Sequence, residues 1–173
     1  MFLTFLRKIL NETRRIKNKI RYKNFKHIGC NFFTQRGFQY VGEKYISIGD
    51  YFNAGEGLML QAWDQYRDFQ DKFSPNLIIG NNVSMMSRCH LSCAQKIEIG
   101  DGTLFGDNVF VTDNFHGTGA EEERYIPPIE RPLYVKGEVI IGKNVWIGRN
   151  VCIMPNVHIG DCATVGANSV VTK

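Results

Sequence analysis

A six-residue repeat limits what this chain can fold into more than any other feature of its sequence. An aliphatic residue recurs at every sixth position, and glycine directly follows it in most repeats. The fourth residue after each of these aliphatic residues is small or β-branched. The same pattern recurs upstream with more substitutions, in blocks that begin at Ile48, Ile79 and Ile99. In its clearest stretch, every sixth residue is aliphatic and β-branched: Ile141, Ile147, Ile153, Ile159, Val165 and Val171.

Each six-residue unit supplies one short strand and one corner. Side chains alternate along a strand, so the aliphatic residue and the residue two before it point inward. Three units make a triangular coil of about 18 residues, and coils stack by parallel pairing about 4.8 Å apart. The repeat therefore predicts an all-β fold, a parallel β-helix over residues 28–173. The spacing leaves the handedness open, and the usual crossover rule favours the right hand.

Two segments interrupt the repeat. Residues 61–77 are aromatic and charged, whereas residues 113–138 are longer and contain three prolines and three consecutive glutamates. A long loop inside a strict repeat is usually functional or disordered. We therefore expect residues 113–138 to form an extended active-site loop. A smaller irregularity, the 20-residue step from Ile79 to Ile99, predicts one longer turn.

The first 27 residues form a separate basic arm. They hold nine Lys and Arg against one acid, although the net charge of the chain is only +4. An apolar stripe at helical spacing predicts an amphipathic helix. It caps the open end of the β-helix, lies on an anionic membrane through residues 1–22, or binds a partner. The body of the chain is net acidic and offers no basic face for nucleic acid.

Composition narrows the remaining classes. The chain is 43% hydrophobic and 22% charged, which is typical of a globular domain. No apolar run approaches the length of a membrane span, and residues 1–6 are too short for a signal peptide. Five cysteines without CxxC spacing indicate reduced thiols. We expect a cytoplasmic protein, peripheral to the inner face of the membrane if the arm binds lipid.

His116 is the candidate catalytic residue among the four histidines. It stands where the repeat stops, three residues after Asp113, and an imidazole beside a carboxylate can act as a general base near neutral pH. The alternative is an ordinary loop histidine. His90 and His158 each precede an inward residue, so we predict them to be surface histidines, and His27 belongs to the arm.

Residues 136–148, 153–160 and 165–173 resemble the hexapeptide-repeat acetyltransferases, above all in Asn144–Gly148 and Gly166–Lys173. The resemblance extends over about residues 41–173. It is greatest to the maltose, galactoside and colanic-acid O-acetyltransferase-like branch, near the xenobiotic acetyltransferases. It implies a left-handed parallel β-helix, acetyl-CoA as the donor, no metal, and a homotrimer with active sites between subunits.

Carried over by position, the resemblance makes His116 the catalytic base. Arg88 stands where relatives have an active-site asparagine, the loop after His116 is longer, and the chain stops at Lys173 without the usual Asp-Ile-Pro. The acceptor-site positions are Asp113, Asn114 and Arg88. The positions that contact CoA are Trp146, Arg149, Ala167, Thr172 and Lys173.

The resemblance implies an O-acetyltransferase that acts on a sugar or saccharide hydroxyl, in polysaccharide or glycan biosynthesis. His116 would take the hydroxyl proton directly, oriented by a carbonyl or by Glu121, Glu122, Glu123 or Glu130. An amino-sugar N-acetyltransferase and a non-catalytic scaffold are the alternatives. A γ-type carbonic anhydrase would need a zinc-binding histidine spacing that is absent from the sequence. Four aromatic residues either stack on the sugar or pack the flank: Trp63, Tyr66, Phe69 and Phe73.

Overall fold

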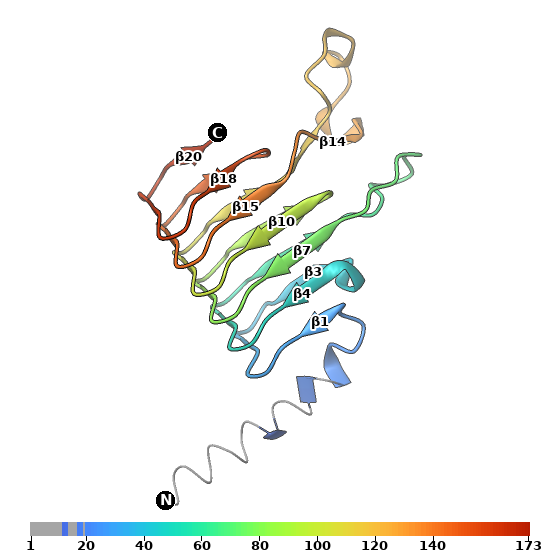
Figure 1. Cartoon of the computed structure of the whole chain (residues 1–173). Helices are drawn as coiled ribbons and strands as arrows, with labels where there is room; N and C mark the ends of the chain where they lie inside the picture. Colours follow the sequence, from blue (N-terminus) through green and yellow to red (C-terminus); the bar gives the residue numbers. More distant parts are fainter. Residues whose placement is uncertain (1–11, 14–16, 19) are drawn as a thin grey trace, which may run out of the picture.

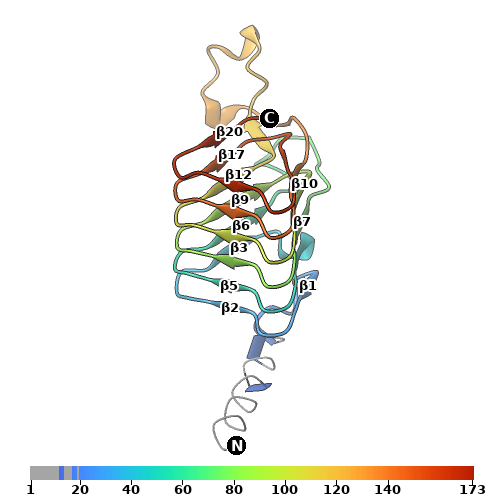
Figure 2. The ribbon, with the colours of Figure 1, turned by 60° about the vertical axis from the view of Figure 1, so that its left-hand side comes forward.

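The chain folds as a left-handed parallel β-helix with a triangular cross-section. The computed structural model describes residues 12–13, 17–18 and 20–173. Figures 1 and 2 show the coils stacked in sequence order, from the arm at one end to the C-terminus near the other. The predicted parallel β-helix is confirmed, and its hand is the one that the family resemblance implied rather than the one that the crossover rule favoured.

Three sheets, each of six strands over the described residues, form the sides of the helix. The first sheet contains β1 (His27–Ile28), β4 (Ile46–Ile48), β7 (Asn76–Ile79), β10 (Lys96–Ile99), β15 (Val139–Ile141) and β18 (His158–Ile159). The second contains β2 (Phe33–Thr34), β5 (Asn53–Ala54), β8 (Ser84–Met85), β11 (Leu104–Phe105), β16 (Trp146–Ile147) and β19 (Thr164–Val165). The third contains β3 (Gln39–Val41), β6 (Met59–Ala62), β9 (His90–Cys93), β12 (Phe110–Thr112), β17 (Cys152–Ile153) and β20 (Val170–Val171).

The repeat positions form the core. Ile141, Ile147 and Ile153 are at most 1% exposed, as are most of their counterparts in the preceding coils. Ile159 and Val165 are only partly buried, because they lie in the last coil and have neighbours on one side. Each coil therefore depends on the next to remove its apolar interior from water.

The corners combine close backbone approach with side-chain hydrogen bonds between coils. A Cβ on Gly100 would lie 2.6 Å from the carbonyl carbon of Gly142 in the next coil, so only glycine fits there. Asp101 follows this glycine, and its Oδ1 accepts from the backbone N–H of Asn81 at 2.7 Å. Three residues after many inward positions the backbone is left-handed, often at asparagine: Asn31, Asn82, Asn108, Asn144, Asn150, Asn156 and Asn168.

Aromatic side chains cover the first coil. Tyr22 and Phe25 are 7% and 8% exposed, and Tyr22 lies edge-on to Phe32, which stacks on Phe52. The described residues before Tyr22 are helical, whereas residues 22–24 form a turn and β1 begins at His27. The helix predicted for residues 1–27 thus ends earlier than expected, and most of it lies outside the described residues. No helix in the described part of the chain has the length and apolarity of a membrane span.

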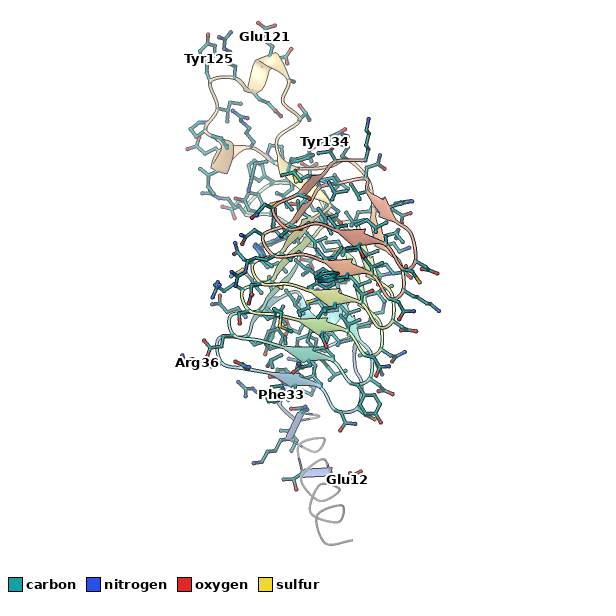
Figure 3. All side chains as sticks on the ribbon, turned by 90° about the vertical axis from the view of Figure 1, so that its left-hand side faces the viewer. Glu12, Phe33, Arg36, Glu121, Tyr125 and Tyr134 are labelled. Atoms are coloured by element: carbon teal, nitrogen blue, oxygen red, sulfur yellow. The ribbon has the colours of Figure 1, made fainter. Side chains whose placement is uncertain are left out.

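The two interruptions leave the coil from the third sheet and meet. The first runs from Trp63 to the start of β7. In the preceding coil, the short η1 helix (Glu43–Tyr45) makes the corresponding connection, from β3 to β4. The second is a hairpin, in which β13 (Asn114–His116) pairs antiparallel with β14 (Leu133–Val135) and the tip carries η2 (Glu121–Glu123) and η3 (Pro128–Glu130). Arg67 Nη1 donates to the Ile129 carbonyl at 3.1 Å, which ties the two together. Figure 3 shows the hairpin projecting beyond the coils, with Glu121 and Tyr125 near its tip and Tyr134 at its base.

Candidate active site

A cavity of about 340 Å³ lies on the outer face of the third sheet, where the two interruptions meet. The coils contribute Gln61, His90, Ser92, Phe110, Thr112 and Met154. The interruptions contribute Trp63, Tyr66, Asn114, Phe115, His116 and Leu133. Cavities of about 520 and 350 Å³ lie at the arm end, against Asn18 and Tyr22. They contain no residue predicted for the site, so we assign the site to the cavity that holds His116.

His116 lies at the rim of this cavity. It ends β13, where its backbone pairs with Leu133 of β14, and its side chain is exposed. The ring of Tyr66 lies edge-on to the imidazole, with 5.1 Å between the ring centroids. The antiparallel pair therefore fixes the backbone of His116, and the first interruption supplies a wall beside its ring.

None of the glutamates proposed to orient His116 forms a hydrogen bond with it within the described residues. Glu123 Oε2 instead accepts from the backbone N–H groups of Thr118 and Gly119 at 2.8 and 2.9 Å. Glu121, Glu122 and Glu130 are exposed on the hairpin. Glu123 thus stabilises the turn after His116.

Asp113 holds the backbone together and does not contact the cavity. It is 0% exposed, and its carboxylate accepts from the backbone N–H groups of Ala94, Gln95 and Lys96 at 2.7 to 2.8 Å. Ala94 and Gln95 form the longer turn that the 20-residue step predicted, and Lys96 begins β10. The assignment of Asp113 as an acceptor contact is therefore corrected: a buried carboxylate with these partners cannot reach a substrate.

Asn114 reaches the cavity wall, but its side chain is already engaged. Asn114 Nδ2 donates to the Ser92 carbonyl at 3.0 Å and to Asp113 Oδ1 at 2.9 Å, and the residue is 8% exposed. Ser92 Oγ in turn accepts from Trp63 Nε1 at 3.3 Å. This network links the coil to both interruptions, so the first role of Asn114 is to hold the wall of the site.

Arg88 lies outside the cavity of its own chain. It occupies a corner, exposed, with a left-handed backbone at φ 60°. Asparagine stands at the equivalent position of later coils, as at Asn108 and Asn150. Arg88 thus occupies a left-handed corner position at which later coils have asparagine. Arginine adopts this backbone conformation less readily than asparagine does.

The positions predicted to contact CoA lie elsewhere on the chain from His116. Trp146 is 56% exposed on the outer face of the second sheet, between Leu104 and Thr164 of neighbouring coils. Arg149 follows at the next corner, where Nη2 lies 2.9 Å from Asp107 Oδ2 and this bond lowers the pKa of Asp107. The backbone N–H of Asn168 donates to the Arg149 carbonyl, which places Ala167 beside Arg149; Thr172 and Lys173 follow β20 and are exposed.

His90 is a cavity residue that the sequence reasoning placed on the open surface. Its side chain is half-buried, its Nε2 lies 2.8 Å from Gln61 Oε1, and its ring lies 5.1 Å from that of Phe110. Burial lowers the pKa of His90. The prediction was wrong because an outward residue is solvent-exposed only where nothing covers the sheet, and here the interruptions cover it.

The aromatic residues of the first interruption differ in whether they line the cavity. Trp63 and Tyr66 line the cavity, with 6.0 Å between their ring centroids. Phe69 stacks on Tyr66 at 6.0 Å and so supports that wall from behind. Phe73 does not line the cavity, and its backbone N–H donates to the Asp64 carbonyl.

The two buried cysteines are not placed for nucleophilic chemistry. Cys89 and Cys93 are 0% exposed, and burial raises the pKa of Cys89 to about 11 and that of Cys93 as well. A thiol with a raised pKa carries little of the reactive thiolate at neutral pH. Within the described residues, no group of three or more His, Cys, Asp or Glu side chains is arranged to hold a metal ion.

Comparison with known proteins connects the repeat to a family. A sequence model described as bacterial transferase hexapeptide (six repeats) matches residues 138–173. The putative lipopolysaccharide biosynthesis O-acetyl transferase WbbJ of Escherichia coli K12 is 36% identical over 130 residues, which is 73% of this chain and 61% of that protein. Galactoside O-acetyltransferase of the same strain is 33% identical over 106 residues, 58% of this chain and 47% of that protein. The chain spans less than two thirds of the length of either relative.

Solved structures share the fold. AntD, an N-acyltransferase from Bacillus cereus in complex with dTDP-4-amino-4,6-dideoxyglucose and coenzyme A, has a TM-score of 0.70 and 21% identity, covering 91% of this chain and 78% of AntD. The hexapeptide-repeat acetyltransferase VCA0836 of Vibrio cholerae, complexed with acetyl coenzyme A, has a TM-score of 0.54 and 22% identity, covering 94% of this chain and 68% of that protein. At these identities the likeness concerns the fold. With the repeat, the sequence relatives and the coil all in agreement, the chain belongs to the hexapeptide-repeat transferase family.

Proposed function

We propose that this protein is an O-acetyltransferase that moves the acetyl group of acetyl-CoA to a hydroxyl of a sugar or saccharide. The observation that carries the proposal is an exposed imidazole, His116, at the rim of an aromatic cavity on a hexapeptide coil. The 36% identity to a putative lipopolysaccharide O-acetyl transferase supports both the reaction and the acceptor class.

The chemistry follows from what an activated thioester needs. His116 takes the proton of the acceptor hydroxyl as its oxygen attacks the thioester carbonyl carbon. The tetrahedral oxyanion then collapses, the C–S bond breaks, and the CoA thiolate takes the proton back from the imidazolium. Backbone N–H groups of an adjacent coil are the natural donors to the oxyanion.

The donor site requires a second chain in this proposal. Trp146 and Arg149 lie on and beside the second sheet, whereas His116 lies over the third, so one chain offers the two halves on different faces. A homotrimer with active sites between subunits brings the CoA surface of one chain to the cavity of its neighbour. Light scattering should therefore report the mass of three chains, and a stable monomer that retains activity would contradict this arrangement.

A hydroxyl acceptor fits the cavity better than an amine. An amino-sugar is protonated near neutral pH, and a site for it gains from a carboxylate that holds the ammonium group. The described residues that line the cavity include no Asp or Glu, and the Asp113 carboxylate nearby is buried and hydrogen-bonded to backbone N–H groups. We therefore place O-acetylation first and amino-sugar N-acetylation second.

The test is acetyl transfer itself. Thiol release from acetyl-CoA is measured across neutral sugars, saccharides and amino-sugars, and the products are treated with hydroxylamine, which cleaves an ester and leaves an amide intact. We expect hydroxylamine-labile products from neutral acceptors. Stable products from amino-sugars alone would establish N-acetylation, and no release with any acceptor would support a scaffold.

Location is part of the same proposal. We place the reaction in the cytoplasm, with the basic arm of residues 1–22 resting on the inner face of the membrane. The support is the net charge of the arm, with nine Lys and Arg against one acid in residues 1–27. Sedimentation with anionic vesicles tests it: binding should disappear when residues 1–22 are deleted, and binding that survives the deletion would contradict it.

A further inference from the structure

The cavity beside His116 contains a second imidazole that the mechanism above does not use. His90 lies on β9, and its Nε2 is 2.8 Å from Gln61 Oε1 on β6. Because an amide oxygen only accepts, the neutral ring donates from Nε2 and keeps its lone pair on Nδ1. Burial lowers the pKa of His90, which keeps the ring neutral near pH 7.

Most other polar groups of the wall are already bonded within the protein. Ser92 Oγ accepts from Trp63 Nε1 at 3.3 Å, and Thr112 Oγ1 donates to the Asn114 carbonyl at 3.0 Å. Within the described residues, His90 Nδ1 and Gln61 Nε2 have no such partner. Gln61 therefore holds the His90 tautomer whose free Nδ1 lone pair, on the far side of the ring from Gln61, can accept the proton of a hydroxyl group.

Four of the other residues that line the cavity are aromatic: Trp63, Tyr66, Phe110 and Phe115. Trp63 and Tyr66 form one wall, and Phe110 lies 5.1 Å from His90 on another. Among the residues that the structure describes, no Lys, Arg, Asp or Glu lines the cavity. A phosphate or carboxylate would need a cationic partner, whereas the apolar face of a neutral ring packs well on aromatic side chains.

We propose that the Gln61–His90 pair determines acceptor specificity by hydrogen-bonding a second hydroxyl of an uncharged acceptor ring while His116 meets the reacting hydroxyl. The inference rests on the proposed function and adds the substrate class to it: a neutral ring with at least two hydroxyls. His90 Nδ1 accepts the proton of the second hydroxyl, and Gln61 Oε1 accepts from His90 Nε2–H and so holds the ring in the tautomer that leaves Nδ1 free. Neither residue exchanges a proton with the reacting atoms, so the pair acts on acceptor recognition and not on the chemical step.

The experiment compares acceptors that differ by one hydroxyl. Thiol release from acetyl-CoA gives kcat/KM for the methyl pyranosides of glucose, galactose and mannose and for their monodeoxy counterparts. At one position other than the acetylated one, removal of the hydroxyl should lower kcat/KM of the wild-type enzyme by about 10- to 100-fold, as expected for a site left with unpaired polar groups. In His90→Phe, removal of the same hydroxyl should lower kcat/KM by less than about threefold, because the imidazole that binds this hydroxyl is absent.

Two further variants keep the test decisive. Gln61→Leu removes the other half of the pair from a half-buried position and should also reduce the discrimination, which covers the case in which His90→Phe fails to fold. His158→Phe is the matched control, since His158 is exposed on β18 of the first sheet and should keep the wild-type ratio. Discrimination that survives in folded His90→Phe or Gln61→Leu overturns the inference and leaves the proposed function intact.

A second readout separates the inference from the proposed function. If the wild-type enzyme acetylates none of these glycosides, the proposed function fails, and binding decides the inference. The ¹⁵N resonances of the His90 ring, assigned by their absence from His90→Phe, are recorded with saturating methyl glycoside. A shift of Nδ1 toward hydrogen-bonded values supports the pair as a hydroxyl reader, and unchanged resonances overturn it.

Discussion

The regular coils and the two interruptions of this molecule are held together in different ways. In the coils, inward side chains such as Ile147 and Phe105 are 0% exposed, and each strand pairs with strands of neighbouring coils along a continuous sheet. The hairpin of the second interruption has three antiparallel residue pairs at its base, and beyond them Tyr125 is 89% exposed. The coil is therefore fixed by burial, and the hairpin by a few local contacts.

This difference decides where chemistry can be placed. A coil position that points inward is committed to packing, and an outward one faces solvent unless something covers it. The interruptions both leave from the third sheet and cover its outer face, so they turn surface positions such as His90 into cavity walls. The candidate site therefore lies where the repeat is broken, and loops on rigid scaffolds commonly carry function.

The largest expected effect belongs to the interruptions and falls on chemistry. His116→Ala should lower the acetyl-transfer rate by about 10²–10⁴, or roughly 3–5 kcal/mol of barrier, because a positioned general base is lost. CoA binding and the circular dichroism spectrum should be unchanged, since His116 lies outside the buried core. His158→Ala serves as the control. A folded, trimeric His116→Ala that keeps more than about a tenth of wild-type turnover would refute the general-base mechanism.

An effect of similar size belongs to the coils and falls on folding. Phe105→Ala should lower the free energy of unfolding by about 3–5 kcal/mol, because a fully buried ring leaves a cavity that the neighbouring coils cannot fill. Tyr125→Ala, at the exposed hairpin tip, should cost less than about 0.5 kcal/mol. Denaturant midpoints at one protein concentration measure both. Equal losses in the two variants would contradict the division between coil and hairpin.

The sequence was sufficient to predict the coils because the six-residue period gives both the position of each strand and the side chain that points inward. Ile141, Ile147 and Ile153 are buried as predicted, and their strands pair in register with the preceding coil. Handedness could not be derived from the spacing, since coils of either hand share the period. The resemblance supplied the hand that the structure has.

The site was predicted only in part, and the reasons differ by residue. His116 could be singled out because it stands where the period stops. The burial of Asp113 also had a signal, since alternation from Val109 and Val111 points position 113 inward. His90 carried no local signal. It could have been found by noting that both interruptions follow the third side of a coil and so flank the outward positions of that sheet.

Asp113 joins the coils to the second interruption through its buried carboxylate. Asp113→Ala should lower the free energy of unfolding by about 2–4 kcal/mol, because the N–H groups of Ala94, Gln95 and Lys96 lose a charged acceptor inside the protein. Asp113→Asn keeps the shape but only one accepting oxygen, so its loss should be smaller. Denaturant unfolding measures both. A folded Asp113→Ala of wild-type stability with altered acceptor KM would restore Asp113 to the acceptor site.

A smaller effect of opposite sign is expected within the coils. Arg88→Asn should raise the free energy of unfolding by about 0.5–1 kcal/mol, because asparagine tolerates the left-handed backbone at this corner better than arginine does. Asn108→Arg, at the equivalent corner of the next coil, should lose more than this, because it also removes the hydrogen bond from Asn108 Nδ2 to Asn150 Oδ1 at 3.0 Å. Thermal unfolding of both variants measures the pair. A destabilised Arg88→Asn would show that the arginine makes contacts that outweigh its backbone strain.

The smallest expected effect concerns the pH dependence of stability at the covered face of the third sheet. Burial lowers the pKa of His90, so on acidification the unfolded chain takes up a proton near pH 6.5 while the folded protein takes it up only at lower pH. Below about pH 6.5 the unfolded state therefore binds more protons, and the free energy of unfolding falls as the pH falls. His90→Gln removes this proton uptake, so its stability should decline less than that of the wild type between pH 7 and pH 5. Denaturant unfolding across this range measures the two slopes. Equal slopes would mean that the His90 ring is as well hydrated in the folded protein as in the unfolded chain. The interruptions would then cover the third sheet less closely than the burial of Ser92 and Thr112 indicates.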